Sequence, residues 1–191
     1  DYPPERDVLY RNDGDGTFTD ISQQAAVTAA ATGMSVACSD VDRDGFMDIF
    51  VANDAMPNFL YRNRGNGTFD EVGLYSGVAY DMNGDVQGNM AAAFGDYDED
   101  GLFDLLTTNY QQQMVAVYRN LGGILFQDMC LATGIGPATV TQVTWGCGFW
   151  DFDNDTLPDV FVACGHLEDS IDQLDPSTSY EQENLIFRGL G

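Results

Sequence analysis

Three acidic segments of the chain have the residue types and spacing to bind a metal ion. The pattern D-x-D-x-D-x-x-x-D begins at residues 40, 96 and 151 of the 191-residue sequence, at intervals of 56 and 55 residues. Four carboxylates within nine residues repel one another, and a hard cation with oxygen ligands relieves that repulsion. The pattern therefore predicts three calcium-binding loops within a repeating structural unit.

Each segment offers carboxylates at positions 1, 3, 5 and 9 and a backbone carbonyl at position 7. The loops are not EF-hands, which close with Glu and lie between helices. The predicted ligands are Asp40, Asp42, Asp44, Phe46 and Asp48 in the first loop, Asp96, Asp98, Asp100, Leu102 and Asp104 in the second, and Asp151, Asp153, Asp155, Leu157 and Asp159 in the third.

Position 6 of each loop must reverse the chain sharply, which favours glycine because a positive φ penalises a side chain. Gly45 and Gly101 meet this demand, whereas the third loop has Thr156. A β-branched residue in a left-handed bend costs roughly 1 to 3 kcal/mol. The sequence thus predicts two well-formed calcium sites and a strained third, with calcium acting as a scaffold.

The overall charge limits the partners of the chain. Thirty-one acidic residues stand against seven arginines and no lysine, for a formal net charge of −24. This charge excludes a nucleic-acid or anionic-membrane surface and favours cations as partners. No apolar run is long enough for a membrane span, and 44% hydrophobic residues predict a folded core.

The cysteines leave two alternatives open. Four cysteines could form two disulfides, or they could remain buried thiols that act as small hydrophobic residues. The cysteines are Cys38, Cys130, Cys147 and Cys164. Calcium loops of this kind suit the calcium concentration outside cells, so we expect a secreted, extracellular or periplasmic protein.

Short β-strands are predicted on both sides of each acidic segment. These stretches are rich in Val, Ile, Phe, Tyr and Thr and are bounded by Gly, Asn and Asp, which is typical of strands. A second landmark, an apolar stretch that ends in Tyr-Arg-Asn or a weaker variant, alternates with the acidic segments. The predicted strands include 34–38, 49–52, 59–63, 68–72, 90–94, 105–108, 116–120, 145–149, 160–163 and 185–189.

Four short antiparallel strands in each repeat predict an all-β fold made of β-propeller blades. The expected units of this single array are 1–29 (partial), 30–83, 84–139 and 140–191, or about 3 to 3.5 blades. Because a propeller needs at least about four blades, we expect the chain to belong to a larger ring or to complete a ring with other copies. The only helix expected lies near residues 21–31.

The acidic loop at 40–48, the strand at 60–63 and the Asn-Gly-Thr-Phe turn at 66–69 resemble FG-GAP or VCBS repeats of integrin α-subunit propellers. They resemble the cartilage acidic protein family and its bacterial relatives more closely. The resemblance implies a secreted protein with an adhesion or matrix role, or with no defined role. The chain departs from the family pattern at Thr156 and in its weakened last strand.

Two further sets of repeated residues have structural interpretations. The arginines at equivalent positions, Arg11, Arg62 and Arg119, are expected to form ion pairs with nearby carboxylates rather than a ligand-binding array. The asparagines that follow them, at positions 12, 63 and 120, are expected to start the next turn.

No set of residues predicts catalysis. His166 is the only histidine, and no nucleophile motif or phosphate-binding loop is present. We therefore expect no catalytic residues and no cofactor other than Ca²⁺. The predicted function is a non-catalytic, calcium-binding module that binds a protein or glycan ligand, or associates with itself through open blade edges. The alternatives are a structural subunit completed by strand pairing between copies and an accessory domain of a longer secreted enzyme.

Overall fold

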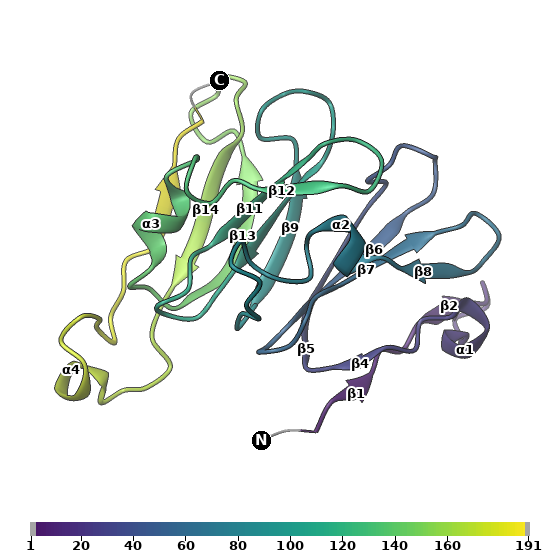
Figure 1. Ribbon diagram of the computed structural model, residues 1–191, viewed down its shortest axis with the longest axis horizontal. Coiled ribbons are helices and arrows are strands. Elements are labelled where there is room, and N and C mark those ends of the chain that lie inside the picture. The colour runs from purple at the N-terminus through teal and green to yellow at the C-terminus, as the bar shows by residue number, and fades with distance from the viewer. Residues whose placement is uncertain (1–2, 190–191) are drawn as a thin grey trace.

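Two complete four-stranded blades lie at the centre of the fold (Figure 1). The computed structural model describes residues 3–189. The first blade contains β5 (Gly33–Ser39), β6 (Asp48–Asn53), β7 (Phe59–Asn63) and β8 (Phe69–Glu71). The second blade contains β9 (Ala91–Gly95), β10 (Asp104–Thr108), β11 (Ala116–Asn120) and β12 (Phe126–Asp128). Each blade is an antiparallel meander in chain order, which confirms the predicted all-β architecture.

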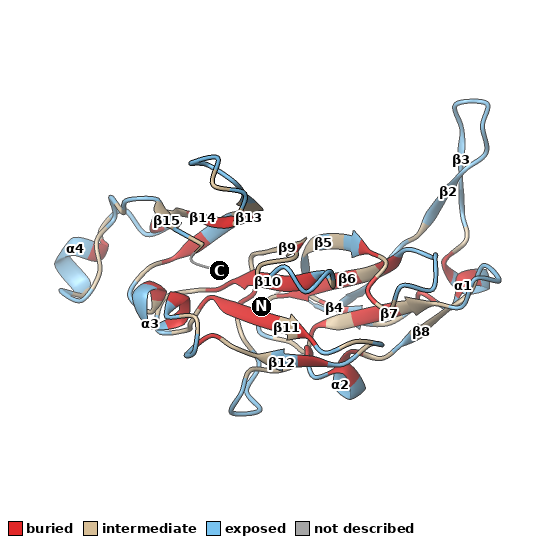
Figure 2. Cartoon of the chain, turned by 90° about the horizontal axis from the view of Figure 1, so that it is seen from above, coloured by how far each residue is buried: buried red, intermediate tan, exposed pale blue. Residues whose placement is uncertain are grey.

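Smaller sheets flank the two complete blades. A three-stranded sheet contains β13 (Thr144–Trp150), β14 (Asp159–Cys164) and β15 (Leu185–Phe187). Towards the N-terminus, β2 (Tyr10–Asn12) pairs with β3 (Phe18–Asp20), and β1 (Glu5–Arg6) pairs with β4 (Ala30–Ala31). The β2–β3 hairpin is exposed along its whole length and projects from the other sheets (Figure 2). Residues 3–189 form an open array of blades rather than a closed ring.

The structure contains four short helices where the sequence predicted one. They are α1 (Ser22–Ala25), α2 (Gly73–Ser76), α3 (Ile135–Thr139) and α4 (Ile171–Leu174). The expected helix near residues 21–31 is only α1, which ends at Ala26 with φ of 61°. A single turn is too short to show the apolar period of a helix, so the other three gave no signal. Within residues 3–189, no helix has the length and apolar character of a membrane span.

All four cysteines are free thiols rather than disulfides, but they are not all buried as the thiol alternative expected. Cys130 is buried, whereas Cys38 is exposed on β5. Cys147 and Cys164 lie on neighbouring strands, but their cross-strand partners are Val162 and Thr144 rather than each other.

The hydrophobic core lies between blades rather than within a single sheet. Phe50 and Leu60 of the first blade pack in one cluster with Leu105 and Tyr118 of the second. A second cluster joins the second blade to the three-stranded sheet through Leu106, Val117, Val160 and Val162. Full burial of one such side chain contributes about 1.5–3 kcal/mol. Each sheet therefore depends on its neighbour for stability.

A buried asparagine joins the two complete blades. Asn120, 1% exposed, donates from Nδ2 to the carbonyl of Val41 (2.9 Å) in the first blade and to the carbonyl of Phe103 (3.1 Å) in its own. Its Oδ1 accepts the Gly122 N–H (2.9 Å), as Asn12 and Asn63 do for Gly14 and Gly65. The prediction that these asparagines start turns is confirmed.

We expect Asn120→Ala to lower the free energy of unfolding by about 1–3 kcal/mol, because it leaves the buried Val41 carbonyl without a donor. Asn63→Ala is the matched control, since Asn63 makes the same turn and bonds within its own blade only. Chemical denaturation of both variants measures the difference. Equal losses would show that the bond between blades contributes nothing beyond the turn.

Candidate metal centres

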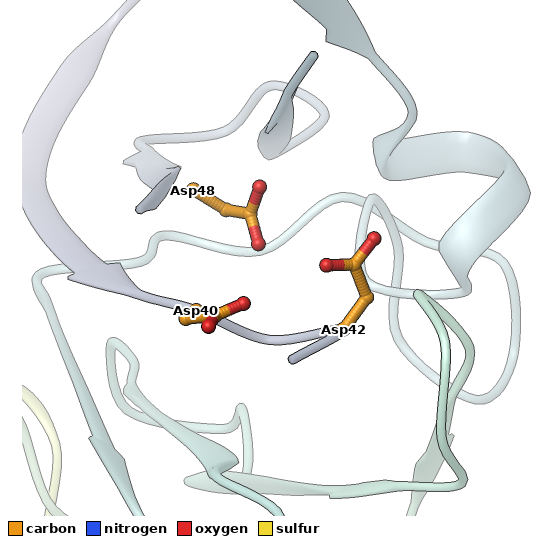
Figure 3. A group of neighbouring side chains, drawn as sticks. All are labelled: Asp40, Asp42 and Asp48. Carbon is orange, nitrogen blue, oxygen red and sulfur yellow. The ribbon is translucent and has the colours of Figure 1, made fainter. Parts of the chain in front are cut away.

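The three acidic loops occupy equivalent places in three sheets. The loops at 40–48, 96–104 and 151–159 connect β5 to β6, β9 to β10 and β13 to β14. In each loop, ligand oxygens from positions 1, 3 and 9 lie within 4.8 Å of one another. Figure 3 shows this cluster in the first loop, where the side chains of Asp40, Asp42 and Asp48 converge. The clusters are Asp40, Asp42 and Asp48; Asp96, Asp98 and Asp104; and Asp151, Asp153 and Asp159.

The predicted carboxylate ligands at position 5 do not belong to these clusters. The position-5 carboxylates of Asp44, Asp100 and Asp155 each accept the N–H of position 7 at 2.9–3.0 Å. Their second oxygens turn towards arginine side chains. The structure thus brings together three of the four predicted carboxylates in each loop.

Two left-handed residues shape each loop. Position 6 has φ of 90° at Gly45, 83° at Gly101 and 79° at Thr156, so the predicted left-handed threonine is confirmed. Position 4 is also left-handed, at Arg43, Glu99 and Asn154. The sequence analysis missed position 4 because no glycine marks it. The third loop has the same backbone conformations at these positions as the other two, despite the cost of the threonine.

The first aspartate of each loop holds the bend in place. Asp40 accepts the N–H groups of Asp44 (3.0 Å) and Gly45 (2.9 Å), one on each oxygen. Asp151 makes the equivalent bonds in the third loop. In the second loop, Asp96 Oδ2 accepts from Gly101 at 2.9 Å, whereas Asp96 Oδ1 is buried without a hydrogen-bond partner in the described chain.

The ninth residue of each loop is a buried clamp. Asp48, 0% exposed, accepts the Val41 N–H (3.0 Å) on one oxygen and the Asn63 N–H (2.8 Å) on the other. Asp104 and Asp159 make the equivalent pairs of bonds. Each clamp joins the start of its loop to the end of the third strand or the residues after it. The spacing pattern predicted a metal ligand at this position but did not predict its two hydrogen bonds to the backbone.

Burial raises the pKa of Asp104 to about 6, and the carboxylates of Asp98 and Asp100 act in the same direction. Burial also raises the pKa of Asp48. In both cases, the two backbone hydrogen bonds act in the opposite direction because they stabilise the ionised form. A cation among these carboxylates would offset both the desolvation and the repulsion.

An arginine on or directly after the third strand of each sheet pairs with positions 3 and 5. Arg62 Nε lies 2.6 Å from Asp42, and Arg119 Nε lies 2.7 Å from Asp98. Arg188 makes the same contacts with Asp153 and Asp155 in the third sheet. Arg11 pairs with Asp13 at 3.0 Å. The predicted ion pairs are confirmed, and because solvent screens them each contributes little to stability.

The residues of the three loops fit a hard cation. All three converging donors in each loop are carboxylate oxygens, which favour hard ions such as Ca²⁺, Mg²⁺ and Mn²⁺ over soft metals. The paired arginine neutralises only one of four carboxylates in each loop. The unpartnered Asp96 Oδ1 adds a buried acceptor that a cation would satisfy. Each acidic cluster could therefore hold a metal ion.

Comparison with known proteins agrees with this geometry. Cartilage acidic protein 1 of Mus musculus is 27% identical over 207 residues, and that of Homo sapiens is 26% identical over the same length. These alignments cover 98% of this chain but only 30% and 29% of the relatives. The chain thus spans less than a third of the relatives it matches. The model of the FG-GAP-like repeat matches residues 2–51 and 40–107, which include the first two acidic loops. This chain belongs to the FG-GAP-like repeat family.

Proposed function

We propose that the chain is a non-catalytic propeller module of an extracellular protein and that each acidic loop holds one Ca²⁺. The observation that carries the proposal is the same three-carboxylate cluster in three sheets, each supported by the same pair of hydrogen bonds at position 9 and by an equivalent arginine. Acidic turns that are only solvated would not require the same side-chain arrangement in all three sheets. The proposed ligands are the carboxylates of positions 1, 3, 5 and 9 and the carbonyl of position 7.

The proposed calcium ions act as a scaffold. A site with a dissociation constant of about 10⁻⁴ M, in about 1 mM calcium, stabilises the folded chain by roughly 1.4 kcal/mol. Three such sites contribute about 4 kcal/mol, a large share of the roughly 5–15 kcal/mol typical of a domain. Because Asp48 and its equivalents also clamp the third strand, a bound ion would stabilise the blade as well as the loop.

The three loops are neighbours on one rim of the blades. The Arg43 guanidinium of the first loop lies near Gly101 of the second, 3.1 Å from the place a Cβ would occupy. Asp96 of the second loop and Asp151 of the third line one shared surface hollow. This rim is where we propose that a protein or glycan partner binds, with the loops held in shape by calcium.

Support for a non-catalytic role comes from the single histidine. His166 is 6% exposed, its Nδ1 accepts the Glu168 N–H (3.0 Å), and its Nε2 lies 3.1 Å from Gln111 Oε1. Both ring nitrogens therefore have structural partners. Relatives named cartilage acidic protein 1 support an extracellular matrix or adhesion setting for this chain.

Self-association is a second candidate, favoured by the unpaired edge of the three-stranded sheet. The outer side of β15 has no strand partner within residues 3–189. An open edge invites pairing with another copy. Size-exclusion chromatography with and without a calcium chelator separates the candidates. We expect a monomer in both conditions if the chain is a module of a larger ring, whereas a concentration-dependent oligomer would favour assembly between copies.

We expect Asp42→Ala to weaken calcium binding at the first loop and to lower the melting temperature chiefly in the presence of calcium. The reason is the loss of one ligand; the accompanying loss of the Arg62 pair costs at most about 1 kcal/mol. Calorimetric titration and thermal melts in calcium and in chelator measure the two effects.

Asp70→Ala is the matched control for Asp42→Ala. Asp70 pairs with Arg64 on the same blade but lies outside the loop. Its loss should leave the calcium affinity unchanged and shift the melting temperature equally in both conditions. If the two variants behave alike, Asp42 is not a calcium ligand.

Thr156→Gly should tighten calcium binding at the third loop, because glycine removes a left-handed strain of roughly 1–3 kcal/mol. The gain in calcium affinity equals the part of that strain that is present in the calcium-bound loop and absent from the metal-free loop. The reverse change, Gly45→Thr, should weaken the first loop, where no atom lies within 4 Å of the added Cβ and backbone strain acts alone. Calorimetric titration of both variants measures the affinities. Unchanged affinity in both would show that position 6 does not control the sites.

A further inference from the structure

Three sulfur atoms meet beside the second blade, away from the acidic loops. Cys130 Sγ lies 3.9 Å from Met82 Sδ and 4.0 Å from Met114 Sδ. Cys130 follows β12, Met114 precedes β11, and Met82 lies in the turn at 81–85 before β9. We call these three side chains the sulfur cluster. They are separated by 16 and 48 residues along the chain, so the fold alone brings them together.

Hydrogen bonds and close packing hold two members of the sulfur cluster in place. The Cys130 N–H donates to Asp128 Oδ1 (2.8 Å), and the Cys130 carbonyl accepts the Gly136 N–H (3.1 Å). A Cβ on Gly136 would lie 3.1 Å from the Cβ atoms of both Cys130 and Met114. Gly136 therefore allows α3 to pack directly against both residues.

The two distances from Cys130 Sγ to the methionine sulfurs fit a shared metal ion. A metal–sulfur bond is about 2.3 Å long, as for zinc thiolates, so two sulfurs of a trigonal site lie about 4.0 Å apart. Thiolate and thioether ligands select soft ions, among them Cu(I). One thiolate and two neutral thioethers would balance the charge of a single monovalent ion.

The surroundings of the sulfur cluster favour a cation. The three side chains line a cavity of about 270 Å³ together with the acidic residues Asp81, Asp85 and Asp128. Carboxylates around a cavity raise the local concentration of cations. Met82 is 55% exposed, which opens the cluster to solvent. Sulfur atoms that served only core packing would not require an exposed methionine in the group.

We propose that Cys130, Met82 and Met114 form a binding site for a soft monovalent metal ion of the Cu(I) class. Burial raises the pKa of the Cys130 thiol to about 12, so the free residue carries its proton at neutral pH. Binding releases that proton to solvent as the metal–thiolate bond forms, and no electron is transferred. The chain would then hold hard ions on its acidic rim and a soft ion beside the second blade.

The test uses the full chain with the exposed Cys38 changed to serine, which removes an adventitious thiol. Cu(I) kept reduced with ascorbate is titrated in competition with bicinchoninate, and X-ray absorption reports the ligands. We expect one ion with a sulfur-only shell at about 2.3 Å. Met82→Leu should lower the affinity at least about tenfold, since even residues that only support a ligand have such effects.

Met34→Leu is the matched control, because Met34 is 50% exposed on β5 and lies outside the sulfur cluster. It should leave the affinity unchanged. Cys130→Ser should abolish binding, and thermal melts of the metal-free variants show whether they fold. If Cys130→Ser does not fold, the Cu(I) affinity of Met82→Leu, compared with that of Met34→Leu, tests the proposal. Equal affinities of the Met82 and Met34 variants, or a shell of nitrogen and oxygen, would overturn the proposal.

Discussion

The buried aspartate at the ninth position of each acidic loop is the contact on which the blade depends. Asp48, Asp104 and Asp159 are at most 2% exposed, and each binds two backbone N–H groups. A buried carboxylate is costly unless its oxygens are satisfied. These two bonds join the loop to the third strand, so the same side chain that contributes an oxygen to the acidic cluster also connects two segments of the sheet.

Charge and packing act together around this contact. Repulsion among four carboxylates destabilises each loop, and the arginine on or directly after the third strand offsets only part of that repulsion. Burial of apolar side chains in the cores between blades stabilises the folded chain against that repulsion. Three Ca²⁺ ions in the loops would add six positive charges and so offset part of the remaining repulsion in a chain with a net charge of −24.

Neighbouring blades are coupled by more than apolar contact. Asn120 bonds to the first blade from the end of β11, next to the residue that pairs with the second acidic loop. The sulfur cluster likewise joins the turn before β9 to segments around β11 and β12. Because each repeat contacts only its neighbours, such contacts add to the stability of the interface between adjacent segments.

The sequence alone predicts the repeat, the strands and the acidic loops, because these depend on residues within nine positions or on alternating patterns of strands. It also identified Thr156 as a strained residue, since φ is a local property. The tertiary structure decided the clamp of Asp48, the pairing of Asp42 with Arg62, and the meeting of Cys130 with Met82. These contacts join residues 15 to 48 positions apart, and only the packing of strands and blades brings such side chains within bonding distance.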